Sequence, residues 1–308
     1  MQNRIVSFLP SATEILYELG AGDQIVGVTH ECNYPKQAKT KPQVIHSSFD
    51  HTTMTSLEID NKVVDLMHSG KDIYILDEQT LKNANPNLII SQGICEVCSP
   101  YTKEVNRAVT ILHNKPEVLI LDPHNLGNIL ENIITIGNKV GKTKEAEKLV
   151  LELQKRIQYV NSRSIEPPKT VLCLEWLDPL FTAGHWVPEM VEMACGINGL
   201  SSTGDQSRRM TIDEAIEYEP ELIVLMPCGF DVKRTISEYD KLANNPKWKS
   251  ILAVKNNQVY AVNANEYFSK PGPRTVTGLE IMAKIIHPET YADLKIPDDS
   301  FQKINTKN

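Results

Sequence analysis

The sequence predicts an α/β protein with two Rossmann-like lobes, each built on a parallel sheet, joined by one long helix. Short apolar runs, such as those at 25–28 and 88–91, alternate with stretches of helical periodicity. This order is typical of parallel α/β sheets. The alternation occurs twice along the chain. With 308 residues, the chain is long enough for each lobe to bury its own hydrophobic core.

The first lobe is expected to span residues 1–142. Its strands are the short apolar runs at 4–8, 25–28, 88–91 and 118–121. Helical periodicity places helices at 10–20, 57–69 and 101–113, and a further helical stretch surrounds Leu81. Ser11 or Thr13 could cap the first of these helices, because their side chains can accept a hydrogen bond from a helical N–H.

A connecting helix is expected over residues 143–166, because Leu149, Leu153 and Ile157 recur at helical spacing among strong helix formers. The second lobe then spans 167–308. Its expected strands lie at 170–174, 222–225 and 258–262, and its expected helices at 187–194, 212–217, 237–243 and 276–286. The tail after Pro288 is polar and is expected to be loosely held.

Composition excludes several classes of protein. A net charge of −7 without blocks of Lys or Arg argues against a nucleic-acid partner. No apolar stretch reaches the ~20 residues that cross a bilayer, so the chain is not expected to be embedded in a membrane. The first residues lack a leader pattern. The sequence as it stands therefore predicts a cytoplasmic protein, or a periplasmic or extracellular one if a leader has been removed. Six cysteines fit a reducing compartment.

Unusual side chains follow five of the expected strands. Ligands of open α/β sheets bind beyond the carboxyl ends of the strands, so these side chains are expected to line one cleft. In the first lobe they are His30, Glu31, Cys32, Gln92, Cys95 and Cys98. In the second lobe they are Glu175, Trp176, His185, Trp186, Cys228, Phe230, Tyr267, Phe268 and Arg274. Large rings beside a few polar groups suit a bulky, flat, partly apolar ligand.

The cysteines allow more than one chemistry. Cys32, Cys95, Cys98 and Cys228 are candidate metal ligands, although a single Cys-x-x-Cys argues against a four-cysteine zinc site. Cys95 and Cys98 could instead form a disulfide or be buried. Cys32 beside His30 could be a reactive thiolate, since a neighbouring imidazolium lowers the pKa of a thiol. In contrast, Cys173 and Cys195 are expected in the core, and His46 and His51 on the surface.

Two groups of motifs are absent from the sequence. It contains neither Gly-x-x-x-x-Gly-Lys-Ser/Thr nor Gly-x-Gly-x-x-Gly, so a phosphate-binding loop has no support. It also lacks Gly-x-Ser-x-Gly, which weakens a hydrolase interpretation.

Several separate motifs resemble the cobalamin-binding members of the class III periplasmic-binding-protein family, which also includes iron–siderophore receptors. They cover nearly the whole chain, in the order and spacing of that family. The matching stretches are Arg4-Ile-Val-Ser-Phe-Leu-Pro-Ser-Ala-Thr-Glu-Ile-Leu, Val26-Gly-Val-Thr, Tyr34-Pro35, Pro86-Asn-Leu-Ile-Ile, Pro179-Leu-Phe-Thr-Ala-Gly, Pro220-Glu-Leu-Ile-Val, Tyr267-Phe268 and Pro273-Arg274.

This resemblance implies two α/β lobes joined by a rigid helix, with a corrinoid bound between them. It implies that aromatic rings hold the corrinoid, a role that Trp176, Trp186, Phe230, Tyr267 and Phe268 would take here. It also implies one surface glutamate on each lobe that docks to an ABC permease. Glu104 and Glu214 fall near the matching positions.

Two hypotheses follow from the sequence. The first is a binding protein for cobalamin, a related corrinoid or another metal chelate, in which a cysteine or histidine reaches the metal as an axial ligand. The second is a cytosolic enzyme that uses a thiol, or a bound zinc or iron ion, in the same cleft. The thiol, imidazole and carboxylate groups of the cleft keep the second hypothesis open, because a fold does not determine a function.

Overall fold

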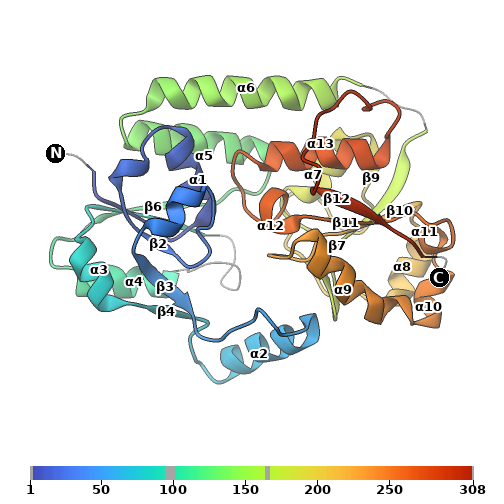
Figure 1. The fold of residues 1–308 in the computed structure, drawn as a ribbon, viewed down its shortest axis with the longest axis horizontal. Helices are drawn as coiled ribbons and strands as arrows, with labels where there is room; N and C mark the ends of the chain where they lie inside the picture. Colours follow the sequence, from blue (N-terminus) through green and yellow to red (C-terminus); the bar gives the residue numbers. More distant parts are fainter. Residues whose placement is uncertain (1–2, 94–101, 164–166, 307–308) are drawn as a thin grey trace. The chain divides into compact units, whose positions relative to one another are not determined.

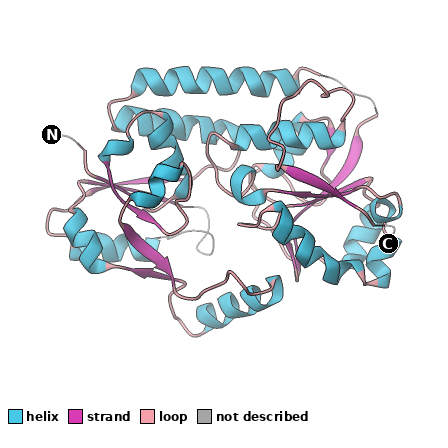
Figure 2. Ribbon diagram, in the orientation of Figure 1, coloured by secondary structure: helices cyan, strands magenta, loops and turns pink. Residues whose placement is uncertain are grey.

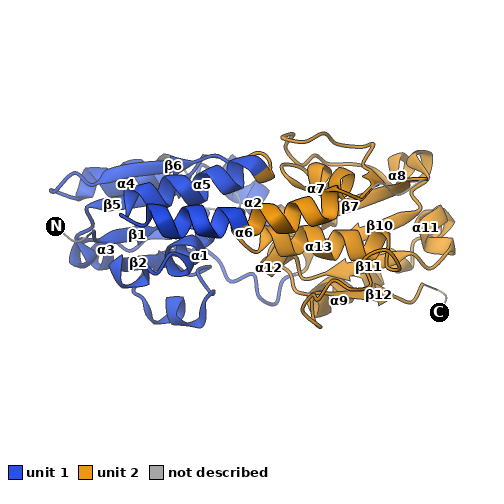
Figure 3. Ribbon diagram, turned by 90° about the horizontal axis from the view of Figure 1, so that it is seen from above, with its two compact units in different colours: residues 1–54, 61–123, 127–151 blue, residues 55–60, 124–126, 152–308 orange. Residues whose placement is uncertain are grey.

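The computed structural model describes residues 3–93, 102–163 and 167–306, and the chain divides into two compact α/β units (Figures 1 and 3). Unit 1 comprises Met1–Met54, Asn61–Pro123 and Gly127–Leu151. Unit 2 comprises Thr55–Asp60, His124–Leu126 and Glu152–Asn308. The predicted fold class, with mostly parallel strands and helices in two lobes, is confirmed. The lobe boundaries at 142 and 167 remain predictions, and the last change from unit 1 to unit 2 along the chain comes after Leu151.

Unit 1 contains a six-stranded sheet in the order β4-β3-β2-β1-β5-β6. Its strands are parallel except for β4, which pairs with β3 in the antiparallel direction. Short apolar strands at the centre of a parallel sheet are buried on both faces, as the fully buried strand β1 shows. The strands are β1 (Ile5–Ser7), β2 (Ile25–Thr29), β3 (Gln43–Ser47), β4 (Tyr74–Leu76), β5 (Leu88–Gln92) and β6 (Glu117–Leu121).

The helices of unit 1 start at residues suited to helix N-termini. Pro10 opens α1, where its missing N–H costs nothing. Asp77 caps α3 by accepting a hydrogen bond from the Thr80 N–H at 2.9 Å. The helices are α1 (Pro10–Glu18), α3 (Glu78–Ala84), α4 (Thr102–Ile111) and α5 (Leu126–Lys139), with 3₁₀ turns η1 (Gly22–Gln24) and η2 (Lys36–Thr40). Helix α2 (Ser56–His68) begins within unit 2.

Unit 2 contains a second sheet in the order β12-β11-β10-β7-β8. The three central strands are parallel, and the two edge strands β8 and β12 are antiparallel to their neighbours. The short strand β9 (Gly196–Ile197) pairs with the start of β7. The other strands are β7 (Lys169–Leu177), β8 (Leu180–Thr182), β10 (Leu222–Leu225), β11 (Val259–Val262) and β12 (Phe301–Ile304).

Helices cover the sheet of unit 2 (Figure 2). One face of the sheet packs through Leu174, Leu225 and Ala261 into a core that contains the fully buried Trp248. The helices are α7 (Val187–Met193), α8 (Ile212–Tyr218), α9 (Val232–Ala243), α10 (Pro246–Ser250), α11 (Leu252–Lys255), α12 (Ala264–Tyr267) and α13 (Thr275–Ile286). None of the helices in the described ranges combines the length and apolar character that a membrane span requires.

The expectation of a loosely held tail after Pro288 was wrong. Strand β12 pairs residue by residue with β11, from Phe301 opposite Val262 to Ile304 opposite Val259. Tyr291 is fully buried, and its hydroxyl donates a hydrogen bond to the Val160 carbonyl at 2.9 Å. A polar edge strand is exposed along much of its length, so its composition resembles that of a disordered tail.

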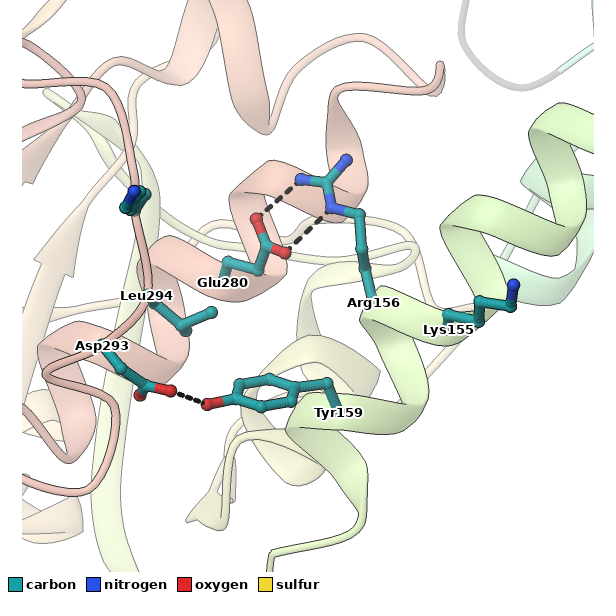
Figure 4. Close-up of a pocket in the computed structure, with 7 residues that line it drawn as sticks. Lys155, Arg156, Tyr159, Glu280, Asp293 and Leu294 are labelled. Carbon is teal, nitrogen blue, oxygen red and sulfur yellow. Dashed lines mark hydrogen bonds and ion pairs between the residues drawn. The ribbon is translucent and has the colours of Figure 1, made fainter.

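The predicted connecting helix is present as α6 (Thr143–Asn161), and its second half is fixed to α13 by a bidentate ion pair (Figure 4). The Arg156 guanidinium donates to both carboxylate oxygens of Glu280, at 2.9 and 2.6 Å, and to Thr277 Oγ1 at 2.8 Å. One turn further along α6, the Tyr159 hydroxyl donates to Asp293. The Glu280 side chain is only 9% exposed, so the ion pair with this arginine compensates the burial of its carboxylate.

We predict that Arg156→Met lowers the free energy of unfolding by about 3 kcal/mol, because it leaves the buried Glu280 carboxylate without its partner. Methionine preserves the apolar stem of the side chain, so loss of packing contributes little. Urea denaturation followed by circular dichroism measures the change. The matched control is Lys155→Met, on the adjacent position of α6, for which a change below about 0.5 kcal/mol is expected. Equal effects of the two substitutions would contradict this account of the ion pair.

Candidate functional site

The predicted site residues of unit 2 come together at the carboxyl ends of β7, β10 and β11. The pairing register aligns Leu174 with Leu225, and Leu225 with Ala261. The last residues of β7, including Glu175 and Trp176, and the segments that follow β10 and β11 therefore lie at one edge of the sheet, where ligands of this fold class bind. Two backbone hydrogen bonds join these segments: Cys228 N–H to the Glu175 carbonyl at 3.1 Å, and Asn265 N–H to the Phe230 carbonyl at 3.0 Å.

Trp176 and Phe230 form an aromatic pair at the carboxyl ends of these strands. Their ring centroids are 5.3 Å apart, with an angle of 58° between the ring planes. The Arg234 guanidinium carbon lies 3.9 Å from the centroid of the Phe230 ring, a distance typical of a cation–π interaction. Phe230 is buried, whereas Trp176 is half-buried. Trp176 is thus the member of the pair that retains surface for contact with a ligand.

The other predicted aromatic residues are buried. Trp186, Tyr267 and Phe268 are 5%, 6% and 3% exposed, respectively. The Trp186 indole N–H donates a hydrogen bond to the Phe268 carbonyl at 3.0 Å, and this bond fixes the position of the indole ring. Burial and the nearby Glu266 carboxylate raise the pKa of Tyr267 to about 12. These contacts are structural, and the ligand-binding role of the three residues remains a prediction.

Polar groups surround the aromatic residues in unit 2. The Glu175 carboxylate accepts a hydrogen bond from the Gly184 N–H at 3.3 Å, and Arg274 donates to Glu266 at 3.1 Å. His185 comes directly after Gly184 and has a positive φ of 55°. The centroid of its ring lies 5.6 Å from the centroid of the Trp186 ring. Gly184 is required here, since a Cβ atom would lie 2.5 Å from the Asp205 carbonyl oxygen.

In unit 1, His30 and Glu31 follow β2 as predicted. His30 Nδ1 lies 3.3 Å from the Ile45 carbonyl oxygen, and Nε2 lies 3.7 Å from the Glu31 carboxylate. Burial lowers the pKa of His30 despite the opposing effect of Glu31. The imidazole is therefore neutral at pH 7, the form that binds metals.

Cys32 is 2% exposed, and the Thr13 hydroxyl donates a hydrogen bond to its sulfur at 3.1 Å. The sulfur is not accessible at the surface, so the structure gives no support to Cys32 as a surface nucleophile. Gln92 ends β5 and is also buried, whereas Cys95 and Cys98 lie outside the described residues.

Metal coordination by the four candidate cysteines remains a prediction. Cys32 belongs to unit 1 and Cys228 to unit 2. Within the ranges that the structure describes, no three His, Cys, Asp or Glu side chains are arranged to hold a metal ion. Of the two cysteines expected in the core, Cys173 is buried, and burial raises the pKa of its thiol far above the usual range. Cys195 is only half-buried.

Two features near these residues were not expected from the sequence. His46, expected on the surface, is a half-buried residue of β3, and both His46 and His51 contribute to the lowered pKa of His30. Ser56, at the start of α2, is fully buried against α9 through Glu238. The Thr55-x-x-Glu58 spacing is a capping-box pattern that could have located the start of α2.

The two predicted docking glutamates occupy first turns of helices. The Glu214 carboxylate closes the capping box of α8, accepting from the Thr211 N–H at 2.8 Å and from Arg208 at 2.7 Å. These hydrogen bonds hold the pKa of Glu214 below its usual value. Glu104 lies in the first turn of α4 and is partly exposed. Their docking role remains a prediction.

An open pocket of about 510 Å³ lies where α6 meets α13 in unit 2 (Figure 4). Its two carboxylates are already paired: Glu280 with Arg156, and Asp293 with Tyr159. Because these pairs fix the connecting helix, we interpret the pocket as a consequence of that packing rather than as the ligand site.

Comparisons with known proteins agree with this architecture. The family profile described as periplasmic binding protein matches residues 5–266. An uncharacterized ABC transporter substrate-binding lipoprotein, YvrC of Bacillus subtilis, is 26% identical in an alignment 298 residues long that covers 94% of this chain and 82% of that protein. The vitamin B12-binding protein of Vibrio cholerae is 25% identical in an alignment 285 residues long that covers 90% of this chain and 86% of that protein.

Among solved structures, the periplasmic heme-binding protein RhuT from Roseiflexus sp. RS-1, in its apo form, has a similar fold. Its TM-score is 0.69 at 20% identity, and the alignment covers 94% of this chain and 99% of RhuT. The profile match covers most of the sequence and agrees with the motifs noted above. The chain therefore belongs to the periplasmic binding protein family.

Proposed function

We propose that this chain is the substrate-binding protein of an ABC transporter and that its ligand is cobalamin or a related metal-bearing macrocycle. The names of its relatives support the transporter role and include vitamin B12 binding. A protein of similar fold binds heme, another flat metal-bearing macrocycle. Both ligands offer an extended apolar face and an axial metal position.

The observation that carries the proposal is the Trp176–Phe230 pair at the carboxyl edge of the unit 2 sheet. Trp176 retains exposed surface, the buried Phe230 ring packs against it, and the Arg234 cation lies over the Phe230 ring. A fixed indole offers a large apolar surface at little entropic cost, which suits a flat macrocycle. In unit 1, the neutral imidazole of His30 is of the type that binds a metal as an axial ligand.

The alternative of a thiol- or metal-dependent enzyme has no comparable observation in its favour. Cys32 is buried under a threonine hydroxyl, and the described residues contain no preformed metal-binding group.

The first prediction from this proposal concerns ligand binding. Hydroxocobalamin added to the purified protein is expected to bind with a micromolar or lower Kd, about −8 kcal/mol or more favourable. If a protein side chain replaces the exchangeable axial hydroxide or water of the cobalt, the absorbance bands of the bound hydroxocobalamin should also shift. Cyanocobalamin is the control for axial ligation, because its cyanide occupies that position. Hemin tests the related macrocycle, and failure of all three compounds to bind would refute the proposal.

The second prediction concerns Trp176. Trp176→Ala is expected to weaken binding of the macrocycle by ~2 kcal/mol, equivalent to about 30-fold in Kd, as for a buried aromatic anchor. Isothermal titration calorimetry measures the change. The matched control is Trp248→Phe, which alters a fully buried tryptophan in the core of unit 2. Unchanged affinity in the alanine variant would exclude Trp176 from the binding surface.

The third prediction concerns docking to a permease. Glu214→Gln retains a side chain that can close the capping box, but it removes the charge that would meet an arginine. Stimulation of ATP hydrolysis by the reconstituted transporter is expected to fall roughly tenfold, the scale of one charge-assisted contact. Glu217→Gln, on the same helix, is the matched control. Equal stimulation by the Glu214 and Glu217 variants would count against the docking role of Glu214.

A further inference from the structure

One short segment of unit 2 comes from a distant part of the sequence. Residues Thr55–Asp60 lie between strands β3 and β4 of the unit 1 sheet along the chain, yet they belong to unit 2 (Figure 3). We call this segment the strap. It contains the first turn of α2, which is closed by a capping box: Thr55 N–H donates to the Glu58 carboxylate at 2.8 Å, and Glu58 N–H to Thr55 Oγ1 at 3.3 Å.

Glu238 on α9 holds the start of the strap. One carboxylate oxygen of Glu238 accepts hydrogen bonds from both the Ser56 N–H at 3.0 Å and the Ser56 hydroxyl at 2.7 Å. A carboxylate at the N-terminus of a helix also interacts favourably with the helix dipole. The Glu238 side chain is 11% exposed and Ser56 is fully buried, so water competes little for these bonds.

The electrostatics of Glu238 agree with this geometry. Burial alone would raise the pKa of Glu238, but the hydrogen bonds from Ser56 and the nearby Lys241 cation lower it below its usual value. Glu238 is therefore ionised at neutral pH, which makes both of its bonds to Ser56 charge-assisted.

The strap also contacts the candidate ligand site directly. The Trp176 indole N–H donates a hydrogen bond to the Ser56 carbonyl at 3.2 Å. Ser56 is therefore hydrogen-bonded to both Glu238 and Trp176. One helical turn later, Asp60 accepts two hydrogen bonds from Arg209, at 3.0 and 2.7 Å. Ser56 and Asp60 are four residues apart and thus lie on the same side of α2.

We propose that Glu238 is a positioning residue for the ligand site: it fixes the strap, and the strap fixes the indole ring of Trp176. Without the strap, the Trp176 side chain keeps its contact with Phe230 but loses the hydrogen bond that sets its rotation. A ring that is fixed before binding loses less conformational entropy when a ligand packs against it. The consequence for affinity rests on the function proposed above, whereas the consequence for Trp176 itself does not.

The test compares Glu238→Ala with Lys241→Ala in the full-length protein. Lys241 lies 3.4 Å from the same carboxylate, but its side chain is half exposed, and its removal leaves both Ser56 hydrogen bonds intact. Hydrogen–deuterium exchange of the peptide covering 55–60 is expected to accelerate about tenfold or more in Glu238→Ala, the loss expected for a charge-assisted hydrogen bond. Lys241→Ala should match the wild type, because exposed ion pairs contribute little.

Acrylamide quenching of tryptophan fluorescence provides a second readout at the site itself. Of the three tryptophans, Trp186 and Trp248 are 5% and 0% exposed, so quenching reports mainly on the half-buried Trp176. Quenching is expected to increase in Glu238→Ala and to stay unchanged in Lys241→Ala. If Glu238→Ala does not fold, Glu238→Gln serves with the same readouts, since its amide oxygen can accept only neutral, weaker hydrogen bonds.

Binding of hydroxocobalamin or hemin then tests the role in recognition. Glu238→Ala is expected to release the bound compound about tenfold faster than the wild type, and Lys241→Ala at the wild-type rate. The proposal would be overturned if hydrogen exchange of residues 55–60 and acrylamide quenching were both unchanged in Glu238→Ala. It would also be overturned if Glu238→Ala released, at the wild-type rate, a compound that the wild type binds. If the wild type binds neither of these compounds nor cyanocobalamin, the proposed function fails, and exchange and quenching still decide whether Glu238 positions Trp176.

Discussion

The parallel pairing of β7, β10 and β11 is the constraint on which the candidate site depends. Strands β10 and β11 are apolar and fully buried, and β7 is buried from Val171 to Leu174, so a shift in register would displace the whole core of unit 2. The register that buries Leu174, Leu225 and Ala261 also brings the three following loops to one edge. The same burial that stabilises the sheet therefore determines which polar and aromatic side chains meet beyond it.

Much of this arrangement could be predicted from the sequence. The central strands are short apolar runs that any parallel sheet must bury. In unit 2 the predicted residue Glu175 lies near the end of β7, and Cys228 and Phe230 lie in the loop after β10. The edge strands β8 and β12 were not predicted. Strand β12 is exposed along most of its length, and β8 has only three residues, so neither shows a strong apolar pattern. The pairing of both strands depends on the backbone groups of a neighbouring strand.

The environment of individual side chains was harder to predict than their location. Cys32 has a polar sequence context but is buried beneath the Thr13 hydroxyl, a contact made by a helix 19 residues away. Trp186 and Phe268 support each other inside the fold, although the same residue types at strand ends are typical of ligand contacts. Periodicity and spacing identify which residues reach the edge of the sheet. They do not determine which of these residues face outward, because long-range packing decides that.

The division of the chain has a consequence for how such a protein can be modified. The chain passes between the two units five times, after Met54, Asp60, Pro123, Leu126 and Leu151. A gene fragment that starts at Glu152 would encode most of unit 2 but would omit two of its segments. That fragment would lack Ser56, whose hydroxyl donates a hydrogen bond to Glu238 and whose carbonyl accepts one from Trp176. It would also lack Leu126, whose N–H donates a hydrogen bond to the Glu189 carboxylate. Recombination between relatives at the connecting helix would thus exchange an incomplete unit, and the strap residues would have to be exchanged with it.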